Sequence, residues 1–179
     1  MKKKIPFAAM TSAFVLASFI ATPLTPIANE VEVDPVGDFT LSLMHTNDTH
    51  AKVETIPHRI TEIKKIRAEK PNAVLLDAGD AFTGTLYFNE FKGQADLKLM
   101  NLAGYDIMIF GNHEFDLGSS AEGHQALVDF IKAAKFPFVS SNVDFSKDEK
   151  FNGLFSDLVS REPENGKIYN GIIKENDTK

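Results

Sequence analysis

The chain has 179 residues, 43% of them hydrophobic, so it can bury the core of one domain but is too short for two of ordinary size. Its formal net charge is −6, and an acidic chain is a poor partner for nucleic acid or for an anionic membrane surface. It contains no cysteine, so disulfides are excluded and any metal ion must be held by oxygen and imidazole ligands.

The first 28 residues are predicted to be a secretory signal peptide. Three lysines at positions 2–4 precede a mostly apolar stretch from Phe7 to Ile20, and we expect cleavage after Ala28. The alternative is a membrane anchor, but about 14 apolar residues interrupted by hydroxyl groups fall short of the 20 or so that a span needs. Removing three lysines and no acid changes the net charge from −6 to −9. We therefore expect a secreted or cell-wall-associated protein with no integral membrane span in its mature form.

Residues 29–38 are acidic, contain a proline and a glycine, and are interpreted as a linker. Residues 39–45 alternate apolar and polar side chains, which predicts a first strand. A helix is expected to begin near Pro57, since a stripe of isoleucines follows at helical spacing: Ile56, Ile60, Ile63 and Ile66. The apolar run 73–76 predicts a second strand covered on both faces.

A second helix is predicted over 94–103, with Gly104 as its C-terminal cap. Residues 107–110 predict a third strand. The sequence 119–122 fits a capping box for a third helix, and 138–143 predicts a fourth strand after Pro137.

Strands and helices thus alternate from residue 39 to residue 143, which predicts an α/β fold with a mainly parallel sheet. From residue 144 to 179 the sequence is charged and contains only short apolar patches. We interpret 144–179 as a polar tail that adds no further element to the sheet.

Polar side chains gather where three of the predicted strands end. Because the carboxyl ends of parallel strands meet at one edge of a sheet, we expect these side chains to form one constellation. Carboxylate, imidazole and amide oxygen suit borderline or hard divalent ions, and two ions about 4 Å apart need a shared carboxylate. The residues are Asp48, His50, Asp80, Asn112, His113 and Asp116.

The roles of these residues can be argued from their positions. Asp48 and His50 are two residues apart, so on an extended segment both can face one ion. Asp80, on the middle strand, is the natural shared ligand, and Asn112 can bind the second ion. His113 would then face the substrate, with Asp116 orienting it and raising its basicity.

Three runs, HTNDTH, LLDAGDAFTGT and FGNHEFD, resemble in order and spacing the secreted bacterial 5′-nucleotidase and 2′,3′-cyclic phosphodiesterase branch of the calcineurin-like metallophosphoesterases. The resemblance covers residues 41–143 and implies the N-terminal half of an αββα sandwich. It implies a phosphohydrolase with two divalent ions, zinc or manganese, and a nucleotide or other phosphate ester as substrate.

Carried over by position, the resemblance implies three metal-binding roles and one catalytic pair. Asp48 and His50 bind the first ion, Asp80 bridges both ions and Asn112 binds the second. His113 stabilises the transition state or assists the leaving group, with Asp116 as its partner.

The sequence also departs from the family pattern. Ala51 replaces a glycine, and the family's later histidine, its Gly-His-x-His segment and its C-terminal nucleoside-binding domain have no counterpart before Lys179. One alternative is therefore a truncated, non-catalytic chain that binds metal weakly. Another is that a separate polypeptide supplies the missing C-terminal half. We expect the chain by itself to be nearly inactive.

The remaining polar candidates are given structural roles. Glu114 is interpreted as an acceptor for nearby backbone amides, and Asp77 as a residue that serves its turn. His58 and His124 are expected to be solvated, and His45 to be packed or paired.

Overall fold

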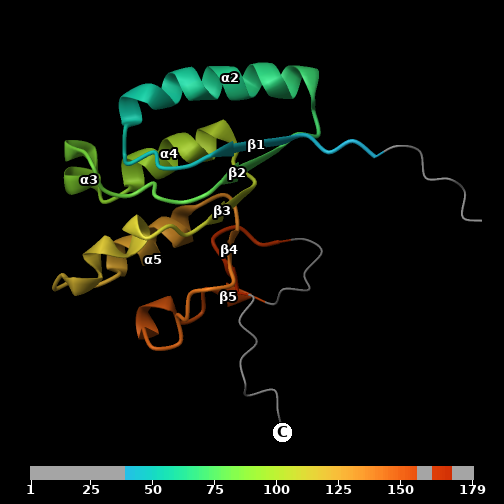
Figure 1. The fold of residues 1–179 in the computed structure, drawn as a ribbon. Helices are drawn as coiled ribbons and strands as arrows, with labels where there is room; N and C mark the ends of the chain where they lie inside the picture. Colours follow the sequence, from blue (N-terminus) through green and yellow to red (C-terminus); the bar gives the residue numbers. More distant parts are fainter. Residues whose placement is uncertain (1–38, 157–162, 171–179) are drawn as a thin grey trace, which may run out of the picture. The chain divides into compact units, whose positions relative to one another are not determined.

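The computed structural model describes residues 39–156 and 163–170, and its six strands form one sheet (Figure 1). The predicted signal peptide and linker lie outside the described residues. Every pair of neighbouring strands is parallel. In spatial order the strands are β1 (Leu43–Thr46), β2 (Val74–Asp77), β3 (Ile107–Ile109), β4 (Phe138–Ser140), β6 (Ile168–Asn170) and β5 (Phe155–Ser156).

The predicted α/β fold with a parallel sheet is confirmed. Four α-helices in the described part connect the strands, and α4 contacts both α2 and α5. Their bounds are α2 (Ile56–Glu69), α3 (Leu86–Phe91), α4 (Gln94–Ala103) and α5 (Gln125–Ala133). Three short 3-10 helices accompany them: η1 (Val53–Thr55), η2 (His113–Ser119) and η3 (Glu149–Phe151).

Local sequence accounts for several of these boundaries. Pro57 lies in the first turn of α2, where its missing amide costs no helical hydrogen bond. Gly104 ends α4 in the left-handed conformation, with φ 73°, and its amide donates to the carbonyl of Met100. The predicted C-terminal cap is therefore confirmed. The loop expected after β2 contains the short helix α3, which Thr85 caps by accepting from the Phe88 amide.

One face of the sheet forms the core with the helices. Side chains from the central strands lie on this face, and all of those named here are at most 1% exposed: Leu75, Met108, Phe138 and Ile168. They share one cluster with apolar side chains of α2, α4 and α5. Burial of these aliphatic and aromatic side chains stabilises the α/β layers by about 1.5–3 kcal/mol each.

The opposite face of the same strands is less covered. Leu43 on β1 is 59% exposed. Ile109 on β3 is 42% exposed, although its neighbour Met108 is fully buried on the other face. The described residues form a single sheet, so the second sheet of the expected αββα sandwich is not among them. The chain thus presents a partial domain of that architecture.

Two expectations about secondary structure are wrong. The segment after residue 144, expected to add nothing to the sheet, contributes β5 and β6, and Ile168 is fully buried beside β4. The predicted capping box at 119–122 does not start a helix, because residues 121–124 form a turn and α5 begins at Gln125. In the described part, no helix is long and apolar enough to cross a membrane.

Substitution of Ile168 tests whether this late strand belongs to the core. Ile168→Ala should lower the free energy of unfolding by about 3 kcal/mol, because it removes buried methyl groups and leaves a cavity. Leu102→Ala is the matched control, since Leu102 is 66% exposed and the change should cost below about 1 kcal/mol. Urea denaturation measures both values, and equal losses would show that β6 does not pack as described.

Candidate metal centre

The loops that follow β1, β2 and β3 meet at the carboxyl edge of the sheet. Backbone hydrogen bonds join the first two loops. The amides of Asp48, His50 and Ala51 donate to the carbonyl oxygens of Gly79, Asp80 and Ala81, respectively, over 2.9 to 3.0 Å. These bonds hold the two loops together beyond the ends of β1 and β2. They place the two predicted ligand loops side by side, as expected for a parallel sheet.

A single buried carboxylate joins the second loop to the third. Glu114, at the start of η2, is 1% exposed and accepts hydrogen bonds from four backbone amides. These belong to Asp80, Ala81, Phe82 and Gly111, at 2.9, 2.8, 3.2 and 2.7 Å. The interpretation of Glu114 as an acceptor for amides is confirmed, and its charge makes each of these bonds stronger than a neutral one.

Several site residues adopt the left-handed backbone conformation. Asp48, His50 and Asp80 have φ values of 51°, 45° and 59°. The expectation that Asp48 and His50 lie on an extended segment is therefore wrong. A left-handed non-glycine residue costs about 1–2 kcal/mol, and such strain persists only where surrounding contacts impose it. Here the paired loops and Glu114 supply those contacts.

Gly79 allows the tips of β2 and β3 to approach each other. Its φ is 92°, and a Cβ atom at this position would lie 2.2 Å from the backbone nitrogen of Gly111. Any side chain there would push the two loops apart. The first glycine of LLDAGDAFTGT is thus explained by close approach of the backbone.

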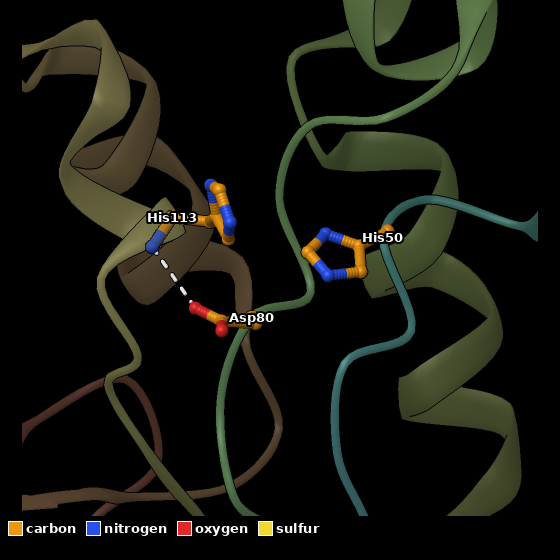
Figure 2. Close-up of side chains that lie close together, drawn as sticks. All are labelled: His50, Asp80 and His113. Atoms are coloured by element: carbon orange, nitrogen blue, oxygen red, sulfur yellow. Dashed lines mark hydrogen bonds between the residues drawn. The ribbon is translucent and has the colours of Figure 1, made fainter.

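The three loops bring together His50, Asp80 and His113 (Figure 2). One ligand atom from each residue lies within 4.8 Å of the others. The two imidazole rings meet edge to face with centroids 4.9 Å apart. The backbone amide of His113 also donates to Oδ1 of Asp80 at 2.9 Å, which ties the third loop to the carboxylate of the second.

Each histidine of this group has a hydrogen-bond acceptor on Nδ1. In His113, Nδ1 lies 2.6 Å from Oδ2 of Asp116, and this contact raises the pKa of the imidazole. In His50, Nδ1 lies 3.2 Å from the carbonyl oxygen of Phe82. Because both partners only accept, Nδ1 carries the proton and Nε2 is left as the basic atom of the neutral ring. The sequence predicted Asp116 as the hydrogen-bond partner of His113. It did not predict the partner of His50, because that partner is a backbone carbonyl and no residue type identifies it.

The other predicted ligands lie at the margin of this group. Oδ1 of Asp48 is 3.8 Å from Nε2 of His50, and its other oxygen accepts from the Asn47 side chain. Asn112 is exposed just before η2, and its side chain makes no capping hydrogen bond. The structure therefore brings together three of the six sequence-predicted residues, with Asp116 behind His113.

The donor set can be compared with what a divalent ion requires. Imidazole and carboxylate ligands lie about 2.0–2.2 Å from zinc, so two ligand atoms of one ion are separated by roughly 3–4.4 Å. A group within 4.8 Å needs only a small closure to hold one ion. In residues 39–156 and 163–170 no second group of three or more such side chains was found. The arrangement fits one ion, and two ions are not shown.

A buried polar network lies beneath the site. Asp77 is 2% exposed, accepts from the Gly79 amide at 2.9 Å and from Thr46 Oγ1 at 2.5 Å. Thr46 Oγ1 is also 2.7 Å from the hydroxyl of Tyr105. Asp77 serves its turn as expected, but its burial raises the pKa of the carboxyl to about 6.

The histidines outside the site differ from one another. His58 is exposed, as expected, and His45 is exposed on β1 rather than packed. The expectation for His124 is wrong. Its Nδ1 lies 2.8 Å from Oδ2 of Asp148, and its ring contacts Phe115 edge to face. It therefore links η2 to the segment after β4.

Comparison with known proteins relates these loops to one family. The family model of the calcineurin-like phosphoesterases matches residues 41–173. The trifunctional nucleotide phosphoesterase YfkN of Bacillus subtilis is 47% identical over 133 residues, which cover 68% of this chain and 9% of that protein. The 5′-nucleotidase of Rattus norvegicus is 36% identical over 157 residues, or 77% of this chain and 25% of the relative.

A solved structure agrees with these matches. The 5′-nucleotidase precursor of Thermus thermophilus superposes with a TM-score of 0.58 at 42% identity. The match covers 64% of this chain and 24% of that one. The chain thus spans a quarter or less of the length of these three relatives.

Replacing Glu114 by glutamine tests its role as the common acceptor. Glu114→Gln should lower the free energy of unfolding by about 3 kcal/mol, because the charge is lost and an NH₂ group faces amide donors. Urea denaturation gives the value. Glu90→Gln is the matched control, since Glu90 is exposed on α3 and the change should stay within about 0.5 kcal/mol. A loss below about 1 kcal/mol for Glu114→Gln would contradict the role described.

Replacing Asp77 by asparagine tests the cost of its buried charge. The pKa of the Asp77 carboxyl is higher in the folded state than in the unfolded state. The free energy of unfolding is therefore largest below pH 4 and decreases as the pH rises to about 6, where the buried carboxyl ionises. Asparagine cannot ionise and still satisfies Thr46 and Gly79. Relative to the parent, Asp77→Asn should therefore gain about 3 kcal/mol between pH 4 and pH 7. Urea denaturation at both pH values measures this gain, and an equal difference at both would refute the buried charge.

Proposed function

This chain belongs to the calcineurin-like phosphoesterase family, and on that premise we propose that it acts in the hydrolysis of nucleotide phosphate esters. The observation that carries the proposal is the convergence of His50, Asp80 and His113 at the carboxyl edge of the sheet. The nucleotide as substrate is supported by relatives named nucleotide phosphoesterase and 5′-nucleotidase. Those proteins are several times longer than the matched region, so their activity enters here only as a proposal.

The proposed centre uses two divalent ions, zinc or manganese. Asp48 and His50 would hold the first, Asn112 the second, and Asp80 would be shared. When bound, such ions polarise the phosphoryl group, neutralise its developing charge and activate water. Support comes from the donor types, which suit these ions, and from the position of Asp80 between the other two loops.

We assign His113 and Asp116 to proton transfer. In this role His113 would hold a proton at Nε2 and donate it to the leaving oxygen of the ester. Asp116 accepts from Nδ1 at 2.6 Å, which fixes the orientation of the ring. Because this contact raises the pKa of His113, the ring keeps its proton to a higher pH.

A second candidate function is metal binding without catalysis. The observation that favours it is that the described residues bring together ligands for one ion only. For the chain by itself we therefore expect slow hydrolysis, because poor positioning of ions and substrate removes a large part of the rate enhancement.

We also propose that the protein is exported, as secreted or cell-wall-associated material. The basic and apolar pattern of residues 1–28 supports this, together with a relative described as a precursor.

Hydrolysis of AMP and of bis(p-nitrophenyl) phosphate with Mn²⁺ tests the proposal. We expect metal-dependent release of phosphate or nitrophenol that falls about 10²-fold or more in His113→Ala. Asp116→Asn should lower the pKa of His113, so the alkaline limb of the pH–rate profile should move to lower pH.

Exposed His58 provides the control, because His58→Ala should leave the rate and the pH profile unchanged. Metal-independent turnover, or turnover that survives in His113→Ala, would contradict the assignment. Absence of any turnover with metal bound would favour the second candidate function.

A further inference from the structure

A buried carboxyl group outside the candidate metal centre has no hydrogen-bond partner. Asp96, in the first turn of α4, is 1% exposed. In residues 39–156 and 163–170, neither of its side-chain oxygens is bonded to another group. The two other buried carboxylates of that part, Asp77 and Glu114, both accept from backbone amides. Asp96 therefore differs from them in lacking the contacts that make a buried charge tolerable.

The surroundings of Asp96 determine when it can ionise. Burial raises the pKa of its carboxyl to about 6, while its own backbone amide acts in the opposite direction. The helix packs against α2, α3, α5 and η1, and the charged side chains that act on Asp96 are Arg59 of α2 and Glu54 of η1. Arg59 favours the carboxylate and Glu54 opposes it. The unpartnered arrangement in the structure thus suits the protonated carboxyl.

Arg59 is the positive partner that an ionised Asp96 can recruit. It is partly exposed, and its guanidinium donates to the hydroxyl of Thr55 over 3.3 Å. That hydroxyl is itself bound to the carbonyl of Lys52 over 2.8 Å. A long bond to a neutral oxygen is weaker than a bond to a carboxylate, so Arg59 gains by changing partners once Asp96 is charged.

We propose that Asp96 and Arg59 form a pH-dependent contact between α4 and α2, open while Asp96 holds its proton and closed as an ion pair when the proton is lost. On closure, the proton leaves to solvent, and the guanidinium exchanges the hydroxyl of Thr55 for the carboxylate. Thr55 ends η1, which follows the first loop of the candidate metal centre, so the exchange takes place at the base of that loop. Neither Asp96 nor Arg59 belongs to the proposed metal centre, and this contact does not require the chain to hydrolyse any ester.

The polar network beneath the metal centre shares the same guanidinium. Arg59 also favours ionisation of Asp77, whose carboxyl has a pKa of about 6, and of Tyr105. The two buried acids, Asp77 and Asp96, therefore ionise over the same pH range beside one cation. An experiment on Arg59 must separate their effects.

NMR of side-chain carboxyl carbons and of arginine Nε in the 179-residue chain tests the proposal. The carboxyl of Asp96 should titrate with a midpoint near pH 6, and Nε of Arg59 should shift over the same range. The Arg59 shift should persist in Asp77→Asn and fall by at least half in Asp96→Asn. Arg67 is the matched control, since it is bound to the carbonyl of Gly104 and to Asp106 and should not shift near pH 6.

Removal of the guanidinium gives the reciprocal measurement. Arg59→Gln should raise the midpoint of Asp96 by about one pH unit, because the carboxylate loses its positive partner. Lys64→Gln removes one positive charge from an exposed position of the same helix and should leave the midpoint unchanged. Circular dichroism verifies that each variant is folded.

Three results would overturn the proposal. The first is a midpoint for Asp96 below about pH 4.5 in the parent, close to that of an exposed aspartate. The second is an Arg59 shift that is unchanged in folded Asp96→Asn, which would assign the shift to Asp77. The third is a midpoint for Asp96 that is the same in Arg59→Gln as in the parent.

Discussion

The candidate site depends on one interaction above all, the carboxylate of Glu114 and the four amides that it binds. Three of these amides are consecutive, in residues 80–82, and the fourth is that of Gly111. Buried amides without partners would each cost about 1–3 kcal/mol, so the loops must stay where the carboxylate can reach them. The position of Asp80 relative to His113 follows from this constraint.

The same constraint explains how the site tolerates its backbone strain. Asp48, His50 and Asp80 are all left-handed, which is unfavourable for residues with a side chain. In these conformations the backbone of the first loop can hydrogen-bond to residues 79–81. They also let the amides of the second loop reach Glu114. The result is that the imidazole of His50 and the carboxylate of Asp80 lie close together. Strain at this edge of the sheet is thus part of how the ligands are arranged.

The sequence predicted the features that depend on local patterns and chain order. Apolar runs identified β2 and β3, Gly104 identified the end of α4, and the parallel alternation implied that polar strand ends would meet. Glu114, which follows β3 among polar residues, was interpreted as an acceptor for nearby amides in preference to a metal ligand. These inferences depend only on local sequence patterns and on the order of elements along the chain.

The features that were missed depend on contacts between distant segments. Polar residues flank Ile168 in the sequence, so the local pattern does not predict a buried strand there. Ile168 is buried because β6 pairs with β4 on one side and β5 on the other. His124 has no local signal for its partner Asp148, which is 24 residues away. The left-handed backbone of His50 and its bond to the Phe82 carbonyl also arise only when two loops pair. No periodicity or motif in the chain encodes such backbone contacts.

Native-state hydrogen exchange of the loop amides tests most directly whether Glu114 holds the loops as one unit. We expect the amides of Asp80, Ala81, Phe82 and Gly111 to exchange with one common opening free energy, because a single carboxylate protects all four. This free energy should be close to that of the core amides in β2. Exchange of Gly111 independently of residues 80–82, or exchange of all four at rates typical of unprotected loops, would contradict the central role of Glu114.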